Sequence, residues 1–239
     1  MQEFANRLHQ ATPTIWVTKT LISINVLAFL TMALAGINPL EPTARELLDV
    51  GGNFLPATVL QPWRLMSATI LHAGLLHLGF NMFALYQMGG IAERFYGNTQ
   101  FLIIYLLAGL FGSLASLFFS ASEAVSVGAS GAVFGVSGAI LAAVVTARNK
   151  LPPMLVTSMS QSMLLFVGYS LFMGFTTSFV DNSAHIGGLV SGFLTAWIMV
   201  ERFDWQEFRR RAVLRATIAI ALAAVAATTM WSLAVISPS

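Results

Sequence analysis

The chain has 239 residues, of which 56% are hydrophobic and only 9% are charged, and its mean hydropathy is +0.76. Soluble domains carry roughly 25% charged residues, so this composition excludes an ordinary globular protein and predicts a polytopic membrane protein. The small net charge of +2 does not indicate nucleic-acid binding, and the absence of cysteine excludes disulfides and thiol chemistry.

Seven apolar runs come close to the roughly 20 residues that a helix needs to cross the hydrocarbon core of a bilayer. In chain order they cover residues 19–36, 65–89, 101–120, 129–147, 154–179, 184–200 and 213–235. No cleavable signal is expected ahead of the first run. The sequence therefore predicts an all-α, polytopic membrane bundle of seven transmembrane helices.

The longest connection, residues 37–64, is expected to hold a short interfacial helix rather than a span. Thr43 and Glu46 form a capping-box pattern, and Gly51 follows where the helix should stop. Trp63, just before the second run, is placed as an anchor at the membrane interface.

The basic residues predict the orientation of the bundle. Arg45 and Arg64 are the two that fall on one side. The N-terminus and the even-numbered loops hold the other ten: Arg7, Lys19, Arg94, Arg148, Lys150, Arg202, Arg209, Arg210, Arg211 and Arg215. Because cytoplasmic loops carry an excess of Lys and Arg, this distribution places the N-terminus in the cytoplasm and, after seven spans, the C-terminus outside.

Two polar residues lie at the start of apolar runs, where polar groups are costly and mark a functional site. Ser130 follows Gly128 and Ala129 at the head of the fourth run, and His185 lies at the head of the sixth. Both runs pass from outside to inside, so their first turns share the outer leaflet. A serine hydroxyl becomes a good nucleophile when an adjacent base such as neutral imidazole removes its proton. These residues are therefore a candidate nucleophile and base.

Small residues recur along one face of the fourth and sixth runs. They are Gly128, Gly131, Gly135 and Gly138 on the fourth, and Ala184, Gly188 and Gly192 on the sixth. Such faces let membrane helices approach closely, which would bring Ser130 and His185 within hydrogen-bond reach. The alternative is ordinary helix packing with no functional meaning.

Other polar residues near the pair have simpler interpretations. Ser137 and Ser191 are interpreted as helix residues that hydrogen-bond to the backbone of the preceding turn. Asp181, four residues before His185, is interpreted as a solvated loop carboxylate rather than the third member of a catalytic triad.

The second run adds His72, His77 and Asn81. His77 and Asn81 share a helix face and could donate hydrogen bonds to a developing oxyanion together with the amide of Ser130, or could only stabilise the bundle. His72 and His77 are about 140° apart around a helix, which makes them poor joint metal ligands. We therefore expect His72 to be structural, bonding the long first loop, and expect no metal or organic cofactor.

Taken in order, these motifs resemble the rhomboid family of intramembrane serine proteases. They are Trp63-Arg64, His72 and His77 with Asn81, Gly128-Ala129-Ser130-Gly131, and Ala184-His185 with Gly188 and Gly192. The resemblance implies a Ser130–His185 dyad without a carboxylate, and an oxyanion hole of His77, Asn81 and the Ser130 amide.

The same resemblance implies supporting roles for the neighbouring positions. Gly128 and Gly131 match the G-x-S-G motif of the family, Gly188 and Gly192 its close-packing glycines, and Trp63-Arg64 its first-loop motif. Phe134 departs from the family, because many relatives carry a tyrosine there that packs against the histidine. The ring is kept and the hydroxyl is lost.

The resemblance further implies a serine endopeptidase that cleaves transmembrane segments of other proteins in the lipid bilayer. Residues 1–18 would be a short cytoplasmic segment, 19–200 a six-helix catalytic core, and 201–239 a linker with one extra transmembrane helix. The fifth helix, with Gly168 and Gly174, would be the lateral gate for substrate. The compact loops favour a bacterial inner membrane.

Two other functions fit parts of this pattern. A protein of the same fold without catalysis could bind client proteins, although such proteins are expected to lack the serine or the histidine. A seven-helix transporter could use a proton or ion path through His72, His77, Asn81 and His185. Many transporters show internal repeats, and none is evident in this sequence.

Overall fold

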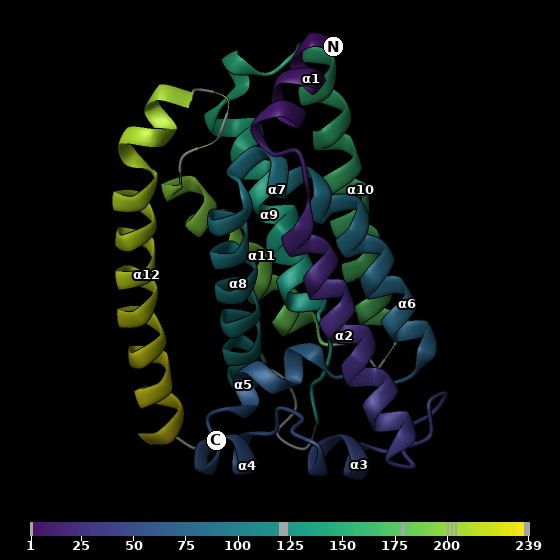
Figure 1. Ribbon diagram of the computed structural model, residues 1–239. Helices are drawn as coiled ribbons and strands as arrows, with labels where there is room; N and C mark the ends of the chain where they lie inside the picture. Colours follow the sequence, from purple (N-terminus) through teal and green to yellow (C-terminus); the bar gives the residue numbers. More distant parts are fainter. Residues whose placement is uncertain are drawn as a thin grey trace.

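The computed structural model describes residues 2–119, 124–177, 180–199, 201, 203 and 205–236. Within these ranges the chain is helical, apart from its loops and one isolated antiparallel bridge between Asn53 and Ser126. The helices stack side by side into a bundle, with short helices across one end (Figure 1). The predicted all-α membrane bundle is confirmed.

Each of the seven predicted runs lies largely in helix. The helices that are long and apolar enough to cross a membrane are α2 (Trp16–Leu34), α8 (Asn98–Phe119), α10 (Pro153–Thr176) and α12 (Trp205–Ile236). The fourth and sixth runs form the shorter helices α9 (Ser130–Thr146) and α11 (Asn182–Ile198), each of 17 residues. Ser120, Phe179, Val200 and Arg202, named in the predictions above, lie outside the described residues.

The second run is not one helix as predicted. The short helices α5 (Arg64–Ser67) and η1 (Ala68–Ile70) lead into a break, and the chain then turns by 91°. Gly74 makes this turn with φ of +110°, and a Cβ there would collide with the carbonyl of Leu40. The continuous span therefore begins at Leu75 and runs through α6 (Leu75–Ala84), the π-helical η2 (Leu85–Gly89) and α7 (Gly90–Tyr96).

The long first loop contains the predicted interfacial helix, α3 (Ala44–Asp49). Both hydrogen bonds of its capping box are present, and those from the backbone and side chain of Thr43 hold the pKa of Glu46 below its usual value. Gly51 follows with φ of +115°. A second short helix, α4 (Leu55–Leu60), was not predicted.

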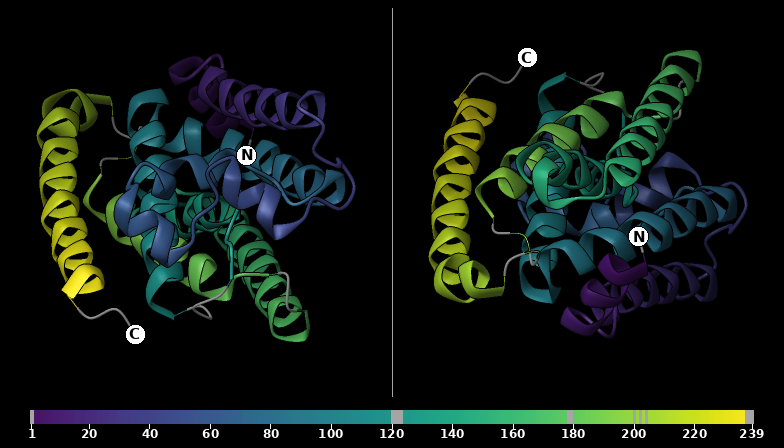
Figure 2. Two further views of the ribbon diagram at one scale, coloured as in Figure 1. Left: turned by 90° about the horizontal axis from the view of Figure 1, so that it is seen from below. Right: turned by 90° about the horizontal axis from the view of Figure 1, so that it is seen from above.

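Helix α9 forms the centre of the bundle. Of its 17 residues, 13 are buried, and it contacts η2, α8, α10 and α11. Views along the bundle place α12 at one edge, beside α8 (Figure 2). The first turn of α9, which begins at Ser130, is thus surrounded by helices while its last turn reaches the opposite end of the bundle.

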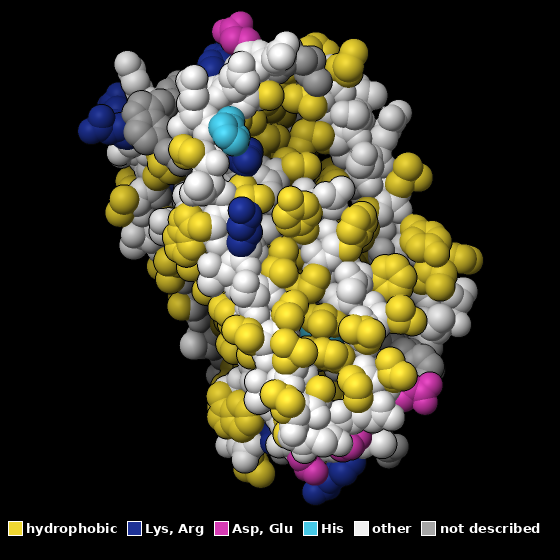
Figure 3. Space-filling model, turned by 45° about the vertical axis from the view of Figure 1, so that its right-hand side comes forward, with side chains coloured by type: hydrophobic (Ala, Val, Ile, Leu, Met, Phe, Trp, Pro, Cys, Tyr) yellow, Lys and Arg dark blue, Asp and Glu magenta, His cyan; other side chains and the backbone are white. Residues whose placement is uncertain are grey.

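The outside of the bundle is strongly apolar. Large side chains such as Leu27, Phe83, Phe172 and Leu222 are more than half exposed. On the face drawn in Figure 3, hydrophobic side chains spread over the middle and lower part, and the charged ones lie in the upper half and at the lower end. Apolar surface on this scale is unstable in water and matches a lipid environment. The protein is a multi-pass membrane protein.

An N-terminal helix and a buried carboxylate were both missed by the sequence prediction. Helix α1 (Gln2–Ala11) packs Phe4 and Leu8 inward. Fully buried Glu93 on α7 accepts hydrogen bonds from the amides of Val17 (2.9 Å) and Thr18 (2.8 Å), at the start of α2. It thereby satisfies helix N-terminal N–H groups that have no partner within α2.

Candidate active site

The glycine faces of α9 and α11 meet backbone to backbone. A Cβ added to Gly188 would collide with the carbonyl of Gly131, and one added to Gly192 would collide with that of Gly135. A Cβ at Gly138 would likewise collide with the carbonyl of Leu189. The two stripes therefore form one close helix contact that leaves no room for side chains, as small residues allow.

These contacts show the register of the two parallel helices. Gly131 lies against both Ala184 and Gly188, and one turn later Gly135 lies against both Gly188 and Gly192. Facing residues of the two helices are thus about 55 positions apart in sequence, and two hydrogen bonds beyond the glycines show the same separation. They join Ser126 to Asp181 (2.7 Å) and Thr146 to Glu201, and each spans 55 residues. Ser130 and His185 have the same separation, so they lie at the same level of the bundle.

The imidazole of His185 lies over the first turn of α9. It stacks on the ring of Phe134, with 4.1 Å between ring centroids and 10° between planes. Phe134 is one turn after Ser130 on the same helix. His185 is buried and Ser130 half-buried. Within the described residues no hydrogen bond joins their side chains, and catalytic hydrogen bonds are often long until substrate binds.

His77 approaches Ser130 from the second span. Gly128 has φ of +128°, and a Cβ there would lie 2.7 Å from Cε1 of His77, 2.8 Å from Nε2 of His77 and 3.8 Å from Oγ of Ser130. The imidazole and the hydroxyl thus flank one glycine. Nδ1 of His77 accepts a hydrogen bond from the amide of Ala73 (3.2 Å), which in a neutral imidazole leaves Nε2 as the N–H donor beside Gly128.

Two more polar groups lie near this point. Asn81 is buried one turn after His77, and its side-chain amide donates to the carbonyl of His77 (2.9 Å). Ser130 is the first residue of α9, so its backbone N–H has no partner within the helix and lies at the positive end of the helix dipole. The site can therefore offer N–H donors from both α6 and α9.

His72 lies in the break between η1 and α6, next to His77. It is fully buried, and its ring meets that of His77 edge-on with 5.2 Å between centroids. Neither ring nitrogen hydrogen-bonds a described residue of the first loop, so the predicted bond to that loop is not observed. Across the described ranges, no group of three or more His, Asp or Glu side chains is placed to hold a metal ion.

Arg64 organises the first loop. Its guanidinium donates to the carbonyls of Leu48 (2.6 Å) and Gly52 (3.1 Å) and lies 4.9 Å from the ring centroid of Trp63. Trp63 itself is about half exposed, as an interfacial anchor would be. The pair therefore holds the loop over the end of the bundle where Ser130 lies.

The serines interpreted as ordinary helix residues are confirmed as such, whereas the interpretation of Asp181 as a solvated carboxylate needs correction. Ser137 donates to the carbonyl of Val133 and Ser191 to that of Gly187. Asp181 lies in the turn before α11, as predicted, but it is half-buried and hydrogen-bonded rather than solvated. Its carboxylate accepts hydrogen bonds from the amide of Ala184 (3.0 Å) and the hydroxyl of Ser126 (2.7 Å), because it caps the N-terminus of α11.

Asn53 is a residue at this site that the sequence did not single out. Its backbone pairs with that of Ser126 in both directions, at 3.0 and 2.8 Å. Its buried side chain donates to the carbonyl of Ser113 (2.9 Å) and accepts from the hydroxyl of Thr58 (2.9 Å). Asn53 therefore ties the segment that leads into Ser130 to the first loop.

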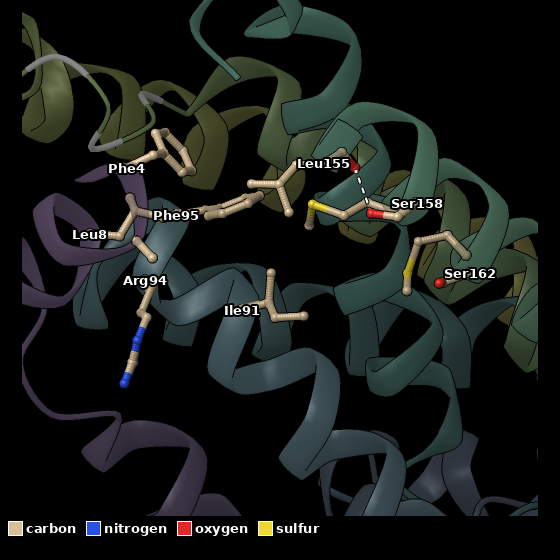
Figure 4. Close-up of a pocket in the computed structure, with 11 residues that line it drawn as sticks. Phe4, Leu8, Ile91, Arg94, Phe95, Leu155, Ser158 and Ser162 are labelled. Carbon is tan, nitrogen blue, oxygen red and sulfur yellow. Dashed lines mark hydrogen bonds between the residues drawn. The ribbon is translucent and has the colours of Figure 1, made fainter. Parts of the chain in front are cut away.

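The suggested gate helix α10 is attached to α11 at one end. Gly174 packs on the side chain of Asn182, which donates to the carbonyl of Leu171 (3.1 Å), while the surroundings of Gly168 are open. A cavity of about 380 Å³ lies near the opposite end of α10, by the N-terminus, and is lined by residues of α1, α7 and α10 (Figure 4). None of its lining residues is a candidate site residue.

Comparison with known proteins matches the Rhomboid domain to residues 59–202. Over 134 residues the chain is 43% identical to Rhomboid protease GluP of Bacillus subtilis, covering 56% of this chain and 25% of that protein. It is 38% identical over 155 residues to the mitochondrial RHOMBOID-like protein 6 of Arabidopsis thaliana, covering 62% and 48% of the two chains.

RHOMBOID-like protein 5 of the same plant is 39% identical over 171 residues, which cover 70% of this chain and 52% of the relative. The chain thus spans between a quarter and about half of the length of these relatives. The matched segment includes His77, Asn81, Ser130 and His185. Because the family model covers more than half of the sequence, the chain belongs to the rhomboid family.

Proposed function

We propose that this protein is an intramembrane serine endopeptidase that cleaves transmembrane segments of other membrane proteins. The observation that carries the proposal is the register of α9 and α11, which puts Ser130 level with the buried imidazole of His185. Membership of the rhomboid family supports intramembrane proteolysis in general. We further propose that residues 19–200 form the catalytic core.

In this mechanism Ser130 Oγ attacks the carbonyl carbon of the scissile peptide bond while His185 accepts the hydroxyl proton. The tetrahedral intermediate collapses as His185 returns that proton to the leaving amine, which leaves an ester on Ser130. Water then attacks the ester with His185 again acting as base, and collapse of the second intermediate frees the acid and restores the hydroxyl.

His77, Asn81 and the amide of Ser130 would stabilise the oxyanion of both intermediates. The Nε2 of His77 already lies beside Gly128, close to the Ser130 hydroxyl, and the amide of Ser130 is not used by its helix. Donors held in place before the reaction cost no reorganisation in the transition state, and one such donor is worth roughly 10²–10³ in rate.

A dyad lacks the carboxylate that orients the imidazole in a catalytic triad. We propose that Phe134 takes over this orienting role, since its ring is parallel to that of His185 and in van der Waals contact with it. The tyrosine hydroxyl found in many relatives is then dispensable.

The charge distribution supports an N-terminus in the cytoplasm and a C-terminus outside, which would put the site near the outer face of the membrane. The compact loops favour a bacterial inner membrane. Water could then reach the acyl-enzyme from outside. Substrates would be single-span proteins with small residues at the cleavage site and a helix that unwinds readily, entering beside α10.

Cleavage of a model transmembrane substrate in proteoliposomes tests the proposal. We expect the wild-type protein to cleave it and Ser130→Ala and His185→Ala to be inactive although folded. Cross-linking α6 to α10 should block cleavage if α10 is the gate. A wild-type protein that binds the substrate without cleaving it would instead indicate a client-binding function, and cleavage by Ser130→Ala would exclude Ser130 as nucleophile.

A further inference from the structure

Two side-chain hydrogen bonds bracket the contact between α9 and α11. At the end near Ser130, the hydroxyl of Ser126 donates to Oδ2 of Asp181 (2.7 Å). At the other end, the hydroxyl of Thr146 donates to Oε1 of Glu201. Ser126 lies four residues before Ser130, and Asp181 lies four residues before His185. This bond therefore joins the segment that precedes the nucleophile to the segment that precedes the base.

Asp181 sets the start of α11. Its Oδ1 accepts from the amide of Ala184 (3.0 Å), and its backbone carbonyl accepts from the amide of His185 (3.1 Å). A capping residue of this kind determines where a helix begins. The position of the imidazole-bearing first turn is therefore fixed by the same residue that binds Ser126.

Ser126 is held equally firmly on its own side. Its backbone is paired with Asn53, and two residues later the amide of Gly128 donates to the carbonyl of Ala68 (2.9 Å). The segment that leads into Ser130 is thus fixed to the first loop and to the short helix η1 before the second span. The Ser126–Asp181 hydrogen bond links this fixed segment to α11.

The glycine contact between the helices cannot supply this precision alone. Gly131, Gly135, Gly188 and Gly192 have no side chains that interdigitate, so they permit close approach without locking the helices against sliding. Proton transfer requires the nucleophile and base within hydrogen-bond distance, and a misplacement of about 1 Å can cost roughly 100-fold in rate.

We infer that Asp181 is a positioning residue for the dyad, which acts through its hydrogen bond to Ser126 by setting the distance between Ser130 and His185. The inference rests on the proposed function. It assigns the carboxylate no contact with substrate and no proton transfer. Its effect is to hold two helices whose close contact is made largely by glycine backbone.

The decisive variant is Ser126→Ala, because it removes the bond and leaves the cap of α11 intact. The full-length protein is reacted with a fluorophosphonate, in which Ser130 Oγ displaces fluoride, and kcat and KM are measured on a transmembrane substrate. We expect Ser126→Ala to lower the labelling rate and kcat by about 10- to 100-fold with KM little changed.

Conservative variants separate positioning from folding. Ser126→Thr keeps a hydroxyl, and Asp181→Asn keeps a cap that can also bond Ser126, so both should stay close to the wild-type rate. Asp181→Ala should slow labelling at least as much as Ser126→Ala, and the double variant should be no slower than Asp181→Ala. Thr146→Val, which removes the matching bond at the far end, is the control and should label normally.

The inference is overturned if Ser126→Ala labels Ser130 at the wild-type rate, if Thr146→Val is equally slow, or if the effects of Ser126→Ala and Asp181→Ala multiply. A wild-type protein that is not labelled at Ser130 at all overturns the proposed function instead. The two failures are therefore distinguishable.

Discussion

At the residue scale, Glu93 and His185 show two ways in which a buried polar side chain is held in this protein. Glu93 accepts hydrogen bonds from Val17, Thr18 and Asn98, which is enough to account for its burial. His185 has a buried Nδ1 with no hydrogen-bond partner among the described residues, and a ring held by stacking. Glu93 is thus held by hydrogen bonds that suit a structural role, whereas the ring contact of His185 leaves its imidazole nitrogens available for the proposed proton transfer.

The proposed oxyanion donors provide one prediction. His77→Ala and Asn81→Ala should each lower kcat by roughly 10²–10³ and change KM much less, because the donors act on charge that develops in the transition state. Steady-state kinetics on a transmembrane substrate measures both. If the residues only stabilise the bundle, the variants will lose thermal stability and keep kcat.

The base provides a prediction about pH. Imidazole accepts the serine proton only while it is neutral, so kcat/KM should fall toward acid pH as His185 becomes protonated. The measurement is the rate of peptide cleavage in proteoliposomes across pH values at which the protein stays folded. Because the surroundings of a buried imidazole can move its protonation away from the usual pH range, the assignment is contradicted if kcat/KM stays constant down to the most acidic pH at which the protein is folded.

The residues that sequence reasoning finds are those whose type is unusual for their surroundings. Ser130 and His185 stand out because they begin apolar runs. Glu93 was missed because the second span was predicted to end at residue 89. Asn53 was missed because its partners, Ser113 and Ser126, are distant in sequence, and no sequence motif around Asn53 predicts the bridge.

At the element scale, the close contact between α9 and α11 depends on glycines, which have no side chain to keep the two backbones apart. Gly188→Ala would place a methyl group against the carbonyl of Gly131, which belongs to the backbone and cannot rotate away. We expect a loss of about 1–3 kcal/mol in the free energy of unfolding, as for other overpacked sites, together with lower activity.

Gly168→Ala on α10 is the matched control. No atom lies within 4 Å of an added Cβ there, so the substitution should be neutral or slightly stabilising because alanine favours helix. Thermal unfolding of both variants in detergent makes the comparison. Equal behaviour of the two would show that the close contact does not limit stability.

Element boundaries show what apolar patterning conveys and what it does not. Each run of apolar residues lies largely in helix, because helices inside the bundle and helices facing lipid are both apolar. The break before Leu75 was missed because residues on both sides of it are apolar, and the 91° turn depends on the conformation of Gly74 and on its contact with Leu40. Hydropathy carries no information about such tertiary contacts.

At the scale of the whole molecule, the two ends of the bundle differ in construction. One end carries the N-terminus and α1, and the other carries the first loop with α3 and α4 (Figure 1). The basic residues lie mainly toward the first of these ends by sequence. The positive-inside rule assigns that end to the cytoplasm.

Because the chain has no cysteine, single cysteines can test this orientation directly. Glu41→Cys in the first loop should react with a membrane-impermeant maleimide added outside intact cells. Lys150→Cys, between α9 and α10, should react only after the membrane is opened. The opposite pattern would reverse the predicted topology, and would place Ser130 near the cytoplasmic face.

The central claim is that Ser130 is a nucleophile activated by His185. Its most direct test is to treat the purified protein with a fluorophosphonate and locate the adduct by mass spectrometry of its peptides. The account predicts a single modification on Ser130 that disappears in Ser130→Ala and is strongly reduced in His185→Ala. An adduct on another residue, or undiminished labelling of His185→Ala, would contradict it.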